Sequence, residues 1–377
     1  MAATLAFAVA LSAALFFHGT HLTAFAYSLA ALVAGLGAGL ALRHARGIEI
    51  PRSALVIALT LFWAWIGLSI LWSEVPYASA INFWWVGALP LAFWLYTLAP
   101  DRERAWRGAG AAALAIGLAL AGYGLWQTFA DHLPPRSLFL NPNSYAAFLN
   151  LILLTAAGRW LVAAARGRAG VVRYAWAAAV AALAFGVALV LGRGLGRGAT
   201  LTLAIGLAVL LLAARRVGLR ATATALALTV AGAFVAANLL LHGGVAERLE
   251  TLFNPASAGA GRFVIWSGAW RMYLTHPWFG TGLGTFWLAW PPFRNPADAS
   301  GGFYAHNDYL QIAIETGVVG VTLLAAVLAA TLARFRAAWR ARVDPAQAVE
   351  LASLFAALVA VAAHSFLTFN LYILPID

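Results

Sequence analysis

The sequence predicts an all-α, polytopic integral membrane protein. Two features indicate this class. Of the 377 residues, 63% are hydrophobic and only 10% are charged, whereas about 25% of the residues in soluble globular domains carry a charge. Apolar runs of roughly 17 to 25 residues recur along the chain, and each is long enough to cross about 30 Å of hydrocarbon as a helix.

Eleven apolar segments are expected to span the membrane, and a twelfth could follow the last residues, so we expect about 11 to 12 transmembrane helices. The first segment lacks a basic start and a small-residue cleavage site, which favours a retained span over a signal peptide. The expected spans cover residues 2–17, 22–42, 53–72, 78–99, 108–129, 144–163, 174–191, 199–214, 220–241, 308–331 and 348–370.

The arginines predict the orientation of these spans. All 24 basic residues are arginine, and 17 of them fall in one alternating set of connections. Connections rich in arginine face the cytoplasm, so this set lies there together with the N-terminus. The same rule accounts for most of the +11 net charge, which therefore does not indicate nucleic-acid binding. Seven arginines remain on the outer side: Arg136, Arg193, Arg197, Arg248, Arg262, Arg271 and Arg294.

One long connection divides the chain into three expected parts. Residues 1–241 hold the first nine spans, residues 242–307 form a periplasmic catalytic loop, and residues 308–377 hold the C-terminal spans. The loop is too long for a plain connection, and aromatic residues recur at spacings of four and three within residues 262–275. This pattern predicts an amphipathic helix at the outer membrane boundary, where such residues are favoured. They are Trp266, Trp270 and Tyr273.

Three outward arginines could bind an anion. Arg193 and Arg197 lie four residues apart in the Gly-rich turn LGRGLGRGAT, and Arg262 lies in the long loop. A guanidinium group offers a planar fork of donors and keeps its charge, which suits phosphate. The alternative is a polar turn whose arginines contact lipid headgroups. The glycine patterns of nucleotide-binding loops are not found in the sequence.

His306 is the strongest candidate for proton transfer, because a neutral imidazole can accept a proton near neutral pH. The alternative is a helix cap or an interfacial group at the start of the next span, where Asn307 or Asp308 is expected to be the N-cap. The chain has no cysteine. It also has no His-Glu-x-x-His motif, and His306 and Asp308 would point to different faces of a helix. We therefore expect no metal and no cofactor.

Four segments carry recognisable motifs: GRFVIWSGAWRMYLTHPWFGTGLGTF, YAHNDYLQIAIETGVVG, FLNPNSYAAFL and GRGAT. Together they resemble the O-antigen ligase and polymerase superfamily over residues 138–372, with glycine instead of the usual serine before Arg197. The resemblance implies that His306 is the catalytic base. It also implies that Arg197 and Arg262 bind pyrophosphate, with Arg193 as the alternative to Arg197. It marks as possible supporting residues Asn143, Arg271, Asn307, Asp308 and Tyr309.

The resemblance implies a membrane glycosyltransferase that faces the periplasm from the bacterial inner membrane. The donor would be a glycan on undecaprenyl pyrophosphate, the acceptor lipid A–core, and membrane lipid a further partner. Arg197 and Arg262, rather than a metal, would stabilise the departing pyrophosphate, and transfer would invert the sugar C1. We favour an O-antigen ligase of lipopolysaccharide biosynthesis. The alternatives are an O-linked protein oligosaccharyltransferase, an O-antigen polymerase and, from another class, a lipid-linked oligosaccharide flippase.

Overall fold

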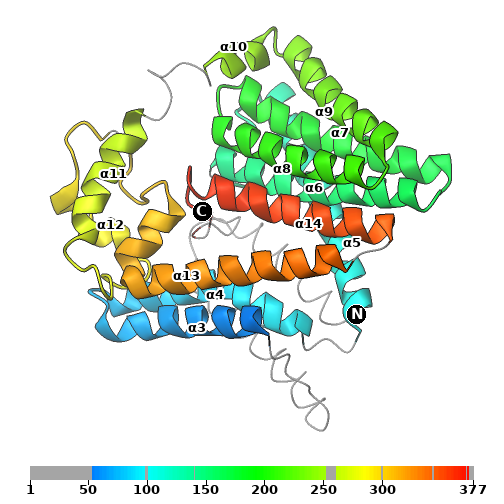
Figure 1. Cartoon of the computed structure of the whole chain (residues 1–377). Coiled ribbons are helices and arrows are strands. Elements are labelled where there is room, and N and C mark those ends of the chain that lie inside the picture. The colour runs from blue at the N-terminus through cyan, green and yellow to red at the C-terminus, as the bar shows by residue number, and fades with distance from the viewer. Residues whose placement is uncertain are drawn as a thin grey trace. The chain divides into compact units, whose positions relative to one another are not determined.

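A computed structural model describes residues 53–97, 101–139, 141–251, 260–298, 300–341, 344–370 and 372. Within these residues every regular element is a helix, which confirms the all-α class (Figure 1). Eight of the described helices are long and apolar enough to cross a membrane, as expected for a polytopic membrane protein. The expected spans 2–17 and 22–42 lie outside the described residues.

Each expected span from residue 53 onwards corresponds to a helix. These helices are α3 (Ala54–Leu68), α4 (Pro76–Thr97), α5 (Arg102–Phe129), α6 (Pro142–Ala165), α7 (Gly170–Gly192), α8 (Arg197–Arg216), α9 (Arg220–Leu240), α13 (Asp308–Arg340) and α14 (Pro345–His364).

Side-chain caps fix where several of the helices begin. The hydroxyl of Ser53 accepts the N–H of Val56 at the start of α3. At α6 the side-chain oxygen of Asn141 accepts the N–H of Asn143 at 2.8 Å, and Pro142 is the first helical residue. Asn and Ser are preferred N-caps, and proline is tolerated in the first turn because its missing N–H would have no helical partner there.

Three helices differ clearly from their expected bounds, and the first of them, α5, begins at Arg102 rather than near residue 108. The expected span 308–331 is part of a helical segment of 33 residues that is interrupted at Gly317 and continues to Arg340. Its arginine-rich end stays helical because arginine is a good helix former. In contrast, α14 ends at His364 rather than near residue 370, since the chain turns at Ser365, whose carbonyl accepts the N–H of Asp308 at 2.8 Å.

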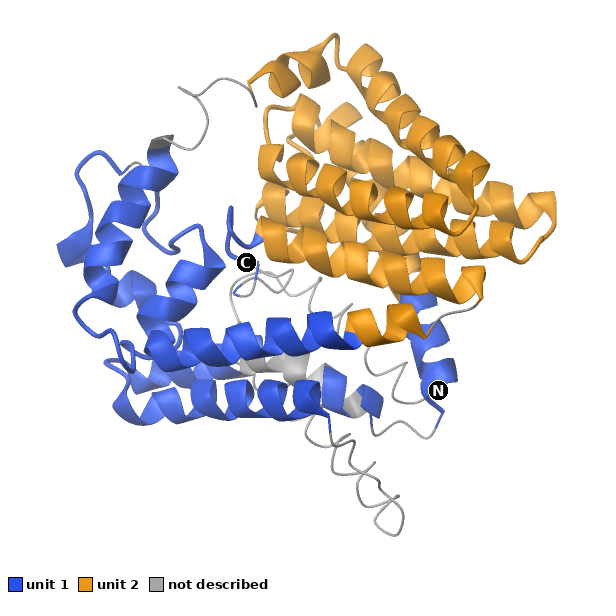
Figure 2. Cartoon of the chain, viewed as in Figure 1, with its two compact units in different colours: residues 1–112, 259–334, 365–377 blue, residues 113–258, 335–364 orange. Residues whose placement is uncertain are grey.

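The chain forms two compact units, coloured blue and orange in Figure 2. Unit 1 comprises residues 1–112, 259–334 and 365–377. Unit 2 comprises residues 113–258 and 335–364. Residues of the expected long loop 242–307 therefore contribute to both units.

Unit 2 is a helical bundle with α6 at its centre. This helix packs against α7, α8 and α14, and a short helix, α10 (Gly244–Glu250), packs on α7. Small residues let the helices approach closely. A Cβ added at Gly158 of α6 would lie 2.1 Å from the hydroxyl of Ser353 on α14, and one at Gly206 of α8 would lie 3.1 Å from the carbonyl of Ala356.

Unit 1 joins α3, α4 and most of α13 to the second part of the long loop. The loop contains α11 (Ala260–Tyr273), α12 (Phe286–Ala289) and the 3-10 turn η2 (Pro291–Phe293), while a second 3-10 turn, η1 (Ser69–Trp72), follows α3. The glycine motif of residues 280–284 runs between α13 and the end of α3. Gly282 has φ of 106°, and a Cβ there would lie 2.3 Å from the hydroxyl of Ser73.

The glycine motif is anchored by a buried carboxylate on α13. Glu315 is fully buried and accepts the N–H of Gly284 at 2.7 Å and the N–H of Phe286 at 3.2 Å. Two residues later α13 is broken at Gly317, which has φ of 68° and ψ of −171°. A Cβ at Gly317 would lie 2.1 Å from the carbonyl of Trp278. The Glu-x-Gly motif therefore holds the long loop against the first turns of α13.

Candidate functional site

His306 lies in the bend just before α13, in a backbone conformation that residues other than glycine seldom adopt. Its φ is 53°, in the left-handed region, which costs about 1–2 kcal/mol for a residue other than glycine. Ala305 is fully buried, and the side-chain oxygen of Asn307 accepts the N–H of Leu310 at 3.1 Å. Asn307 therefore supplies the capping bond expected at the start of α13. The backbone on both sides of His306 is held in place.

The imidazole of His306 packs edge-on against Phe369, with ring centroids 4.9 Å apart. Burial and then the positive charge of Arg262 lower the pKa of His306 to about 4, although Asp298 acts in the opposite direction. At neutral pH the ring is therefore uncharged and can accept a proton. This is the protonation state that the expected catalytic role requires.

The next two residues secure the start of α13. Asp308 is fully buried, and its N–H donates to the carbonyl of Ser365 at 2.8 Å. The ring of Tyr309 stacks at a tilt on Phe366, with centroids 4.3 Å apart. Both residues lie directly beside His306 in the chain. Their observed contacts tie this segment to the turn that follows α14.

Arg262 lies in the first turn of α11, which is helical as the aromatic spacing predicted. The buried stripe of α11, however, consists of Ile265, Ala269 and Met272, whereas Trp270 is 54% exposed. The aromatic stripe thus lies beside the buried stripe. Arg262 remains close enough to His306 for its charge to affect that ring.

Arg271, at the other end of α11, has a different environment. Its Nη2 donates to the carbonyl of Phe293 at 3.2 Å, which joins α11 to η2. Nearby in the loop, the Nε of Arg294 pairs with the carboxylate of Asp298 at 3.1 Å. Burial would raise the pKa of Asp298, but hydrogen bonds from Ser300 and the charge of Arg294 lower it overall. Asp298 therefore carries the negative charge that acts on His306.

Arg193 and Arg197 belong to unit 2, where a Gly-rich turn separates α7 from α8. Arg197 is the first residue of α8, after Gly196 with φ of 72°. Burial and then the charge of Arg197 lower the pKa of Arg248, on α10, below its ordinary value. The Nε of Arg248 is buried and makes no hydrogen bond within the described part of the chain. Two guanidinium groups therefore lie near each other, which favours an anionic ligand.

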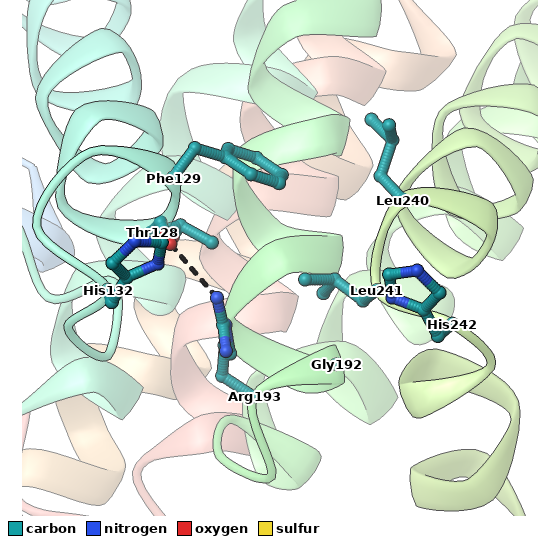
Figure 3. A pocket seen from close by; sticks show the side chains of 8 residues that line it. All are labelled: Thr128, Phe129, His132, Gly192, Arg193, Leu240, Leu241 and His242. Atoms are coloured by element: carbon teal, nitrogen blue, oxygen red, sulfur yellow. Dashed lines mark hydrogen bonds between the residues drawn. The ribbon is translucent and has the colours of Figure 1, made fainter.

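Arg193 lies in a separate pocket of about 330 Å³ within unit 2. Its Nη2 donates to the carbonyl of Thr128 at 2.9 Å. Figure 3 shows the side chains of Arg193, His132 and His242 around this pocket. The remaining lining residues are Thr128, Phe129, Gly192, Leu240 and Leu241. This mixture of cationic and apolar groups suits either of the two ligands expected for Arg193, a phosphate group or a lipid headgroup.

Asn143 lies in the first turn of α6, in unit 2, and its N–H is bound by the N-cap Asn141. A second asparagine of the same helix, Asn150, is buried and donates to the carbonyl of Ala199 on α8 at 2.7 Å. The polar link between α6 and the arginine-bearing start of α8 is thus made by Asn150. The described residues contain no group of three or more His, Asp or Glu side chains that could hold a metal ion.

Sequence reasoning assigned no role to Arg248, Gln311 or Glu315. Arg248 has no motif around it, so its position near Arg197 could not be inferred from spacing. Glu315 stands in the recognised Glu-x-Gly motif, and Gln311 lies one helical turn before it, on the same face of α13. Two polar residues one helical turn apart inside an apolar span indicate a buried hydrogen-bond network. This pattern could have identified Gln311 and Glu315 from the sequence.

Comparison with known proteins identifies the region that contains most of these residues. Residues 180–325 match the family model described as O-antigen ligase. The match runs from α7 into α13 and includes Arg197, Arg262 and His306, whereas Asn143 lies outside it. A comparison with curated proteins gave no match. The match supports a place in the O-antigen ligase superfamily and a membrane glycosyltransferase of the ligase and polymerase type.

Proposed function

We propose that this protein is an O-antigen ligase. It transfers a glycan from undecaprenyl pyrophosphate to a sugar hydroxyl of lipid A–core, at the periplasmic face of the inner membrane. The observation that carries the proposal is the environment of His306. Within the region that matches the O-antigen ligase family, this imidazole is kept uncharged by burial and by Arg262.

In the proposed reaction His306 is the general base. It takes the proton from the acceptor hydroxyl as the oxygen attacks C1 of the donor sugar. The bond between C1 and the pyrophosphate oxygen breaks, and the pyrophosphate leaves with the electron pair. Attack from the opposite face inverts C1, and His306 then releases its proton to water. A positioned base contributes about 10²- to 10⁴-fold to the rate of such a step.

Because of Arg262, the basicity of His306 should depend on whether the donor is bound. A conjugate acid with a pKa of about 4 makes His306 a weak base in the free protein. When the anionic donor binds at Arg262, its negative charge offsets the charge that lowers this pKa. His306 should then become a stronger base once the donor is present. Arg262 would also stabilise the charge that develops on the leaving pyrophosphate.

The roles of Arg197 and Arg193 as further pyrophosphate ligands are proposed from the family resemblance. The proximity of Arg197 to Arg248 supports an anion at the start of α8, because a negative charge bound beside both guanidinium groups would offset their mutual repulsion. We propose that the arginines, and not a metal ion, neutralise the leaving group.

The choice among acceptors can be tested directly. Purified protein in detergent would receive an undecaprenyl-pyrophosphate glycan together with lipid A–core, a second donor molecule or a serine-containing peptide. Ligase activity predicts a glycosylated lipid A–core and little product with the other two acceptors. A lengthened glycan on undecaprenyl pyrophosphate would indicate a polymerase, and a glycopeptide would indicate a protein oligosaccharyltransferase. Either result would overturn the proposed acceptor.

A further inference from the structure

The residue before His306, Ala305, is bound at both its N–H and its C=O by two residues with no catalytic role assigned above. The N–H of Ala305 donates to Oε1 of Gln311 at 3.0 Å. The carbonyl of Ala305 accepts the indole N–H of Trp266 at 3.0 Å. Ala305 itself is fully buried, so neither of its polar groups could turn to water if these bonds were lost. Both hydrogen bonds are therefore expected to persist in the folded state.

The two partners come from different elements of unit 1. Trp266 lies on α11 one helical turn after Arg262, so the two residues share a side of that helix. Gln311 lies in the first turn of α13, and its Nε2 donates to Oε1 of Glu315 at 3.2 Å. Gln311 is 2% exposed and Glu315 is fully buried. Through its N–H and its C=O, Ala305 thus connects the arginine-bearing helix to Gln311 and the buried carboxylate that anchors the glycine motif.

We propose that Trp266 and Gln311 are positioning residues that hold His306 in its reactive orientation and at a fixed distance from Arg262. His306 needs such support, because its φ of 53° is a conformation that its own side chain disfavours. The bond to the N–H of Ala305 restrains the peptide plane between Tyr304 and Ala305, and the bond to its C=O restrains the next plane, which leads directly into His306. This inference rests on the proposed role of His306 as the base.

Trp266→Phe is the sharpest single test, because it removes the indole N–H and leaves an aromatic ring. Trp270→Phe is the matched control, since Trp270 is on the same helix and is 54% exposed. Small displacements of a catalytic group can cost up to about a hundredfold in rate. We expect Trp266→Phe to lower kcat about tenfold with little change in the KM for the donor, and Trp270→Phe to change either by less than about twofold.

A double-mutant cycle separates positioning from a general loss of structure. If Trp266 acts through His306, Trp266→Phe should have almost no further effect in a His306→Ala background. An equal loss of rate in both backgrounds would overturn the positioning role while leaving His306 as the base. Full activity of His306→Ala would overturn the proposed function, and with it the positioning role.

A second measurement does not depend on activity. Gln311→Leu removes the acceptor of the Ala305 N–H, so hydrogen–deuterium exchange should become faster in the peptide that contains Ala305. Trp266→Phe should have a smaller effect in the same peptide, and Trp270→Phe none. Unchanged exchange in both Gln311→Leu and Trp266→Phe would show that the two bonds do not hold this segment, and the proposal would be wrong.

Discussion

Replacement of Glu315 by glutamine should lower the stability of the folded protein by about 2 to 3 kcal/mol. The carboxylate accepts four hydrogen bonds. Its Oε1 accepts from the N–H of Phe286 and the side chain of Gln311, and its Oε2 accepts from the N–H of Gly284 and the hydroxyl of Tyr372. A glutamine has the same shape but only one acceptor oxygen, so two of these donors would face an NH₂ group.

The size of the expected loss of stability depends on which of the four donors can accept a hydrogen bond instead. The hydroxyl of Tyr372 can rotate and accept a hydrogen bond instead of donating one. The N–H of Gly284 cannot, so the least costly orientation of the introduced glutamine leaves this one buried donor without an acceptor. An orphaned buried donor costs about 1–3 kcal/mol. The bonds that remain also lose the assistance of the negative charge, which roughly doubles hydrogen-bond strength.

The assay is thermal unfolding in detergent at one fixed heating rate. For a chain of 377 residues the shift is about 1–2 °C per kcal/mol, so the apparent Tm of Glu315→Gln should fall by roughly 2 to 6 °C. Glu350→Gln is the matched control, because Glu350 pairs with Arg159 at 3.0 Å but its side chain is 28% exposed. Pairs that retain access to solvent contribute about 0–1 kcal/mol. A fall for Glu315→Gln no larger than that of the control would refute the anchoring role of Glu315.

Three further predictions concern the reaction and its orientation. Arg262→Lys keeps the charge but loses the planar fork, so transfer should fall about 30- to 1000-fold. Arg168, in the arginine-rich connection between α6 and α7, is the control, and Arg168→Lys should transfer normally. EDTA should not inhibit the wild type; near-normal transfer by Arg262→Lys would contradict this role. In a plot of kcat/KM against pH, the fall in activity at low pH should be centred near the His306 pKa of about 4. Because Arg262 lowers that pKa, the fall should move to higher pH in Arg262→Gln. A fall that stays in place would contradict the effect of Arg262 on His306. In intact cells an impermeant maleimide should label Ala297→Cys and spare Ala337→Cys, and the reverse pattern would invert the topology.

The membrane helices could be predicted because a single apolar run in hydrocarbon can hydrogen-bond all its backbone N–H and C=O groups only by forming a helix. Their starts were predicted less well, since α5 begins at Arg102 rather than near residue 108, whereas α6 begins at Pro142, two residues before its expected start. The end of α13 was not, because nothing in an arginine-rich stretch distinguishes a helix that leaves the membrane from a loop. The bounds of α14 depend on a contact between Ser365 and Asp308, which lie far apart in sequence.

Only those features of the site that depend on local sequence pattern could be predicted. On α11 the aromatic stripe begins at Trp266 and the buried stripe at Ile265, and both repeat at spacings of four and three. Periodicity alone could not decide between two stripes that are offset by one residue. The indole N–H of Trp266 was expected at a membrane boundary but binds the carbonyl of Ala305. The position of Arg248 near Arg197 depends on how α10 packs, which no motif records.

The most direct test of the proposed mechanism is the single-turnover rate of His306→Ala with a purified undecaprenyl-pyrophosphate donor and lipid A–core acceptor at neutral pH. If His306 is the base, the rate should fall about 10²- to 10⁴-fold, while the donor dissociation constant, measured separately, stays within about twofold of the wild-type value. A rate within a few-fold of the wild type would contradict the mechanism, because an uncharged imidazole held beside Arg262 would then have no part in the transfer.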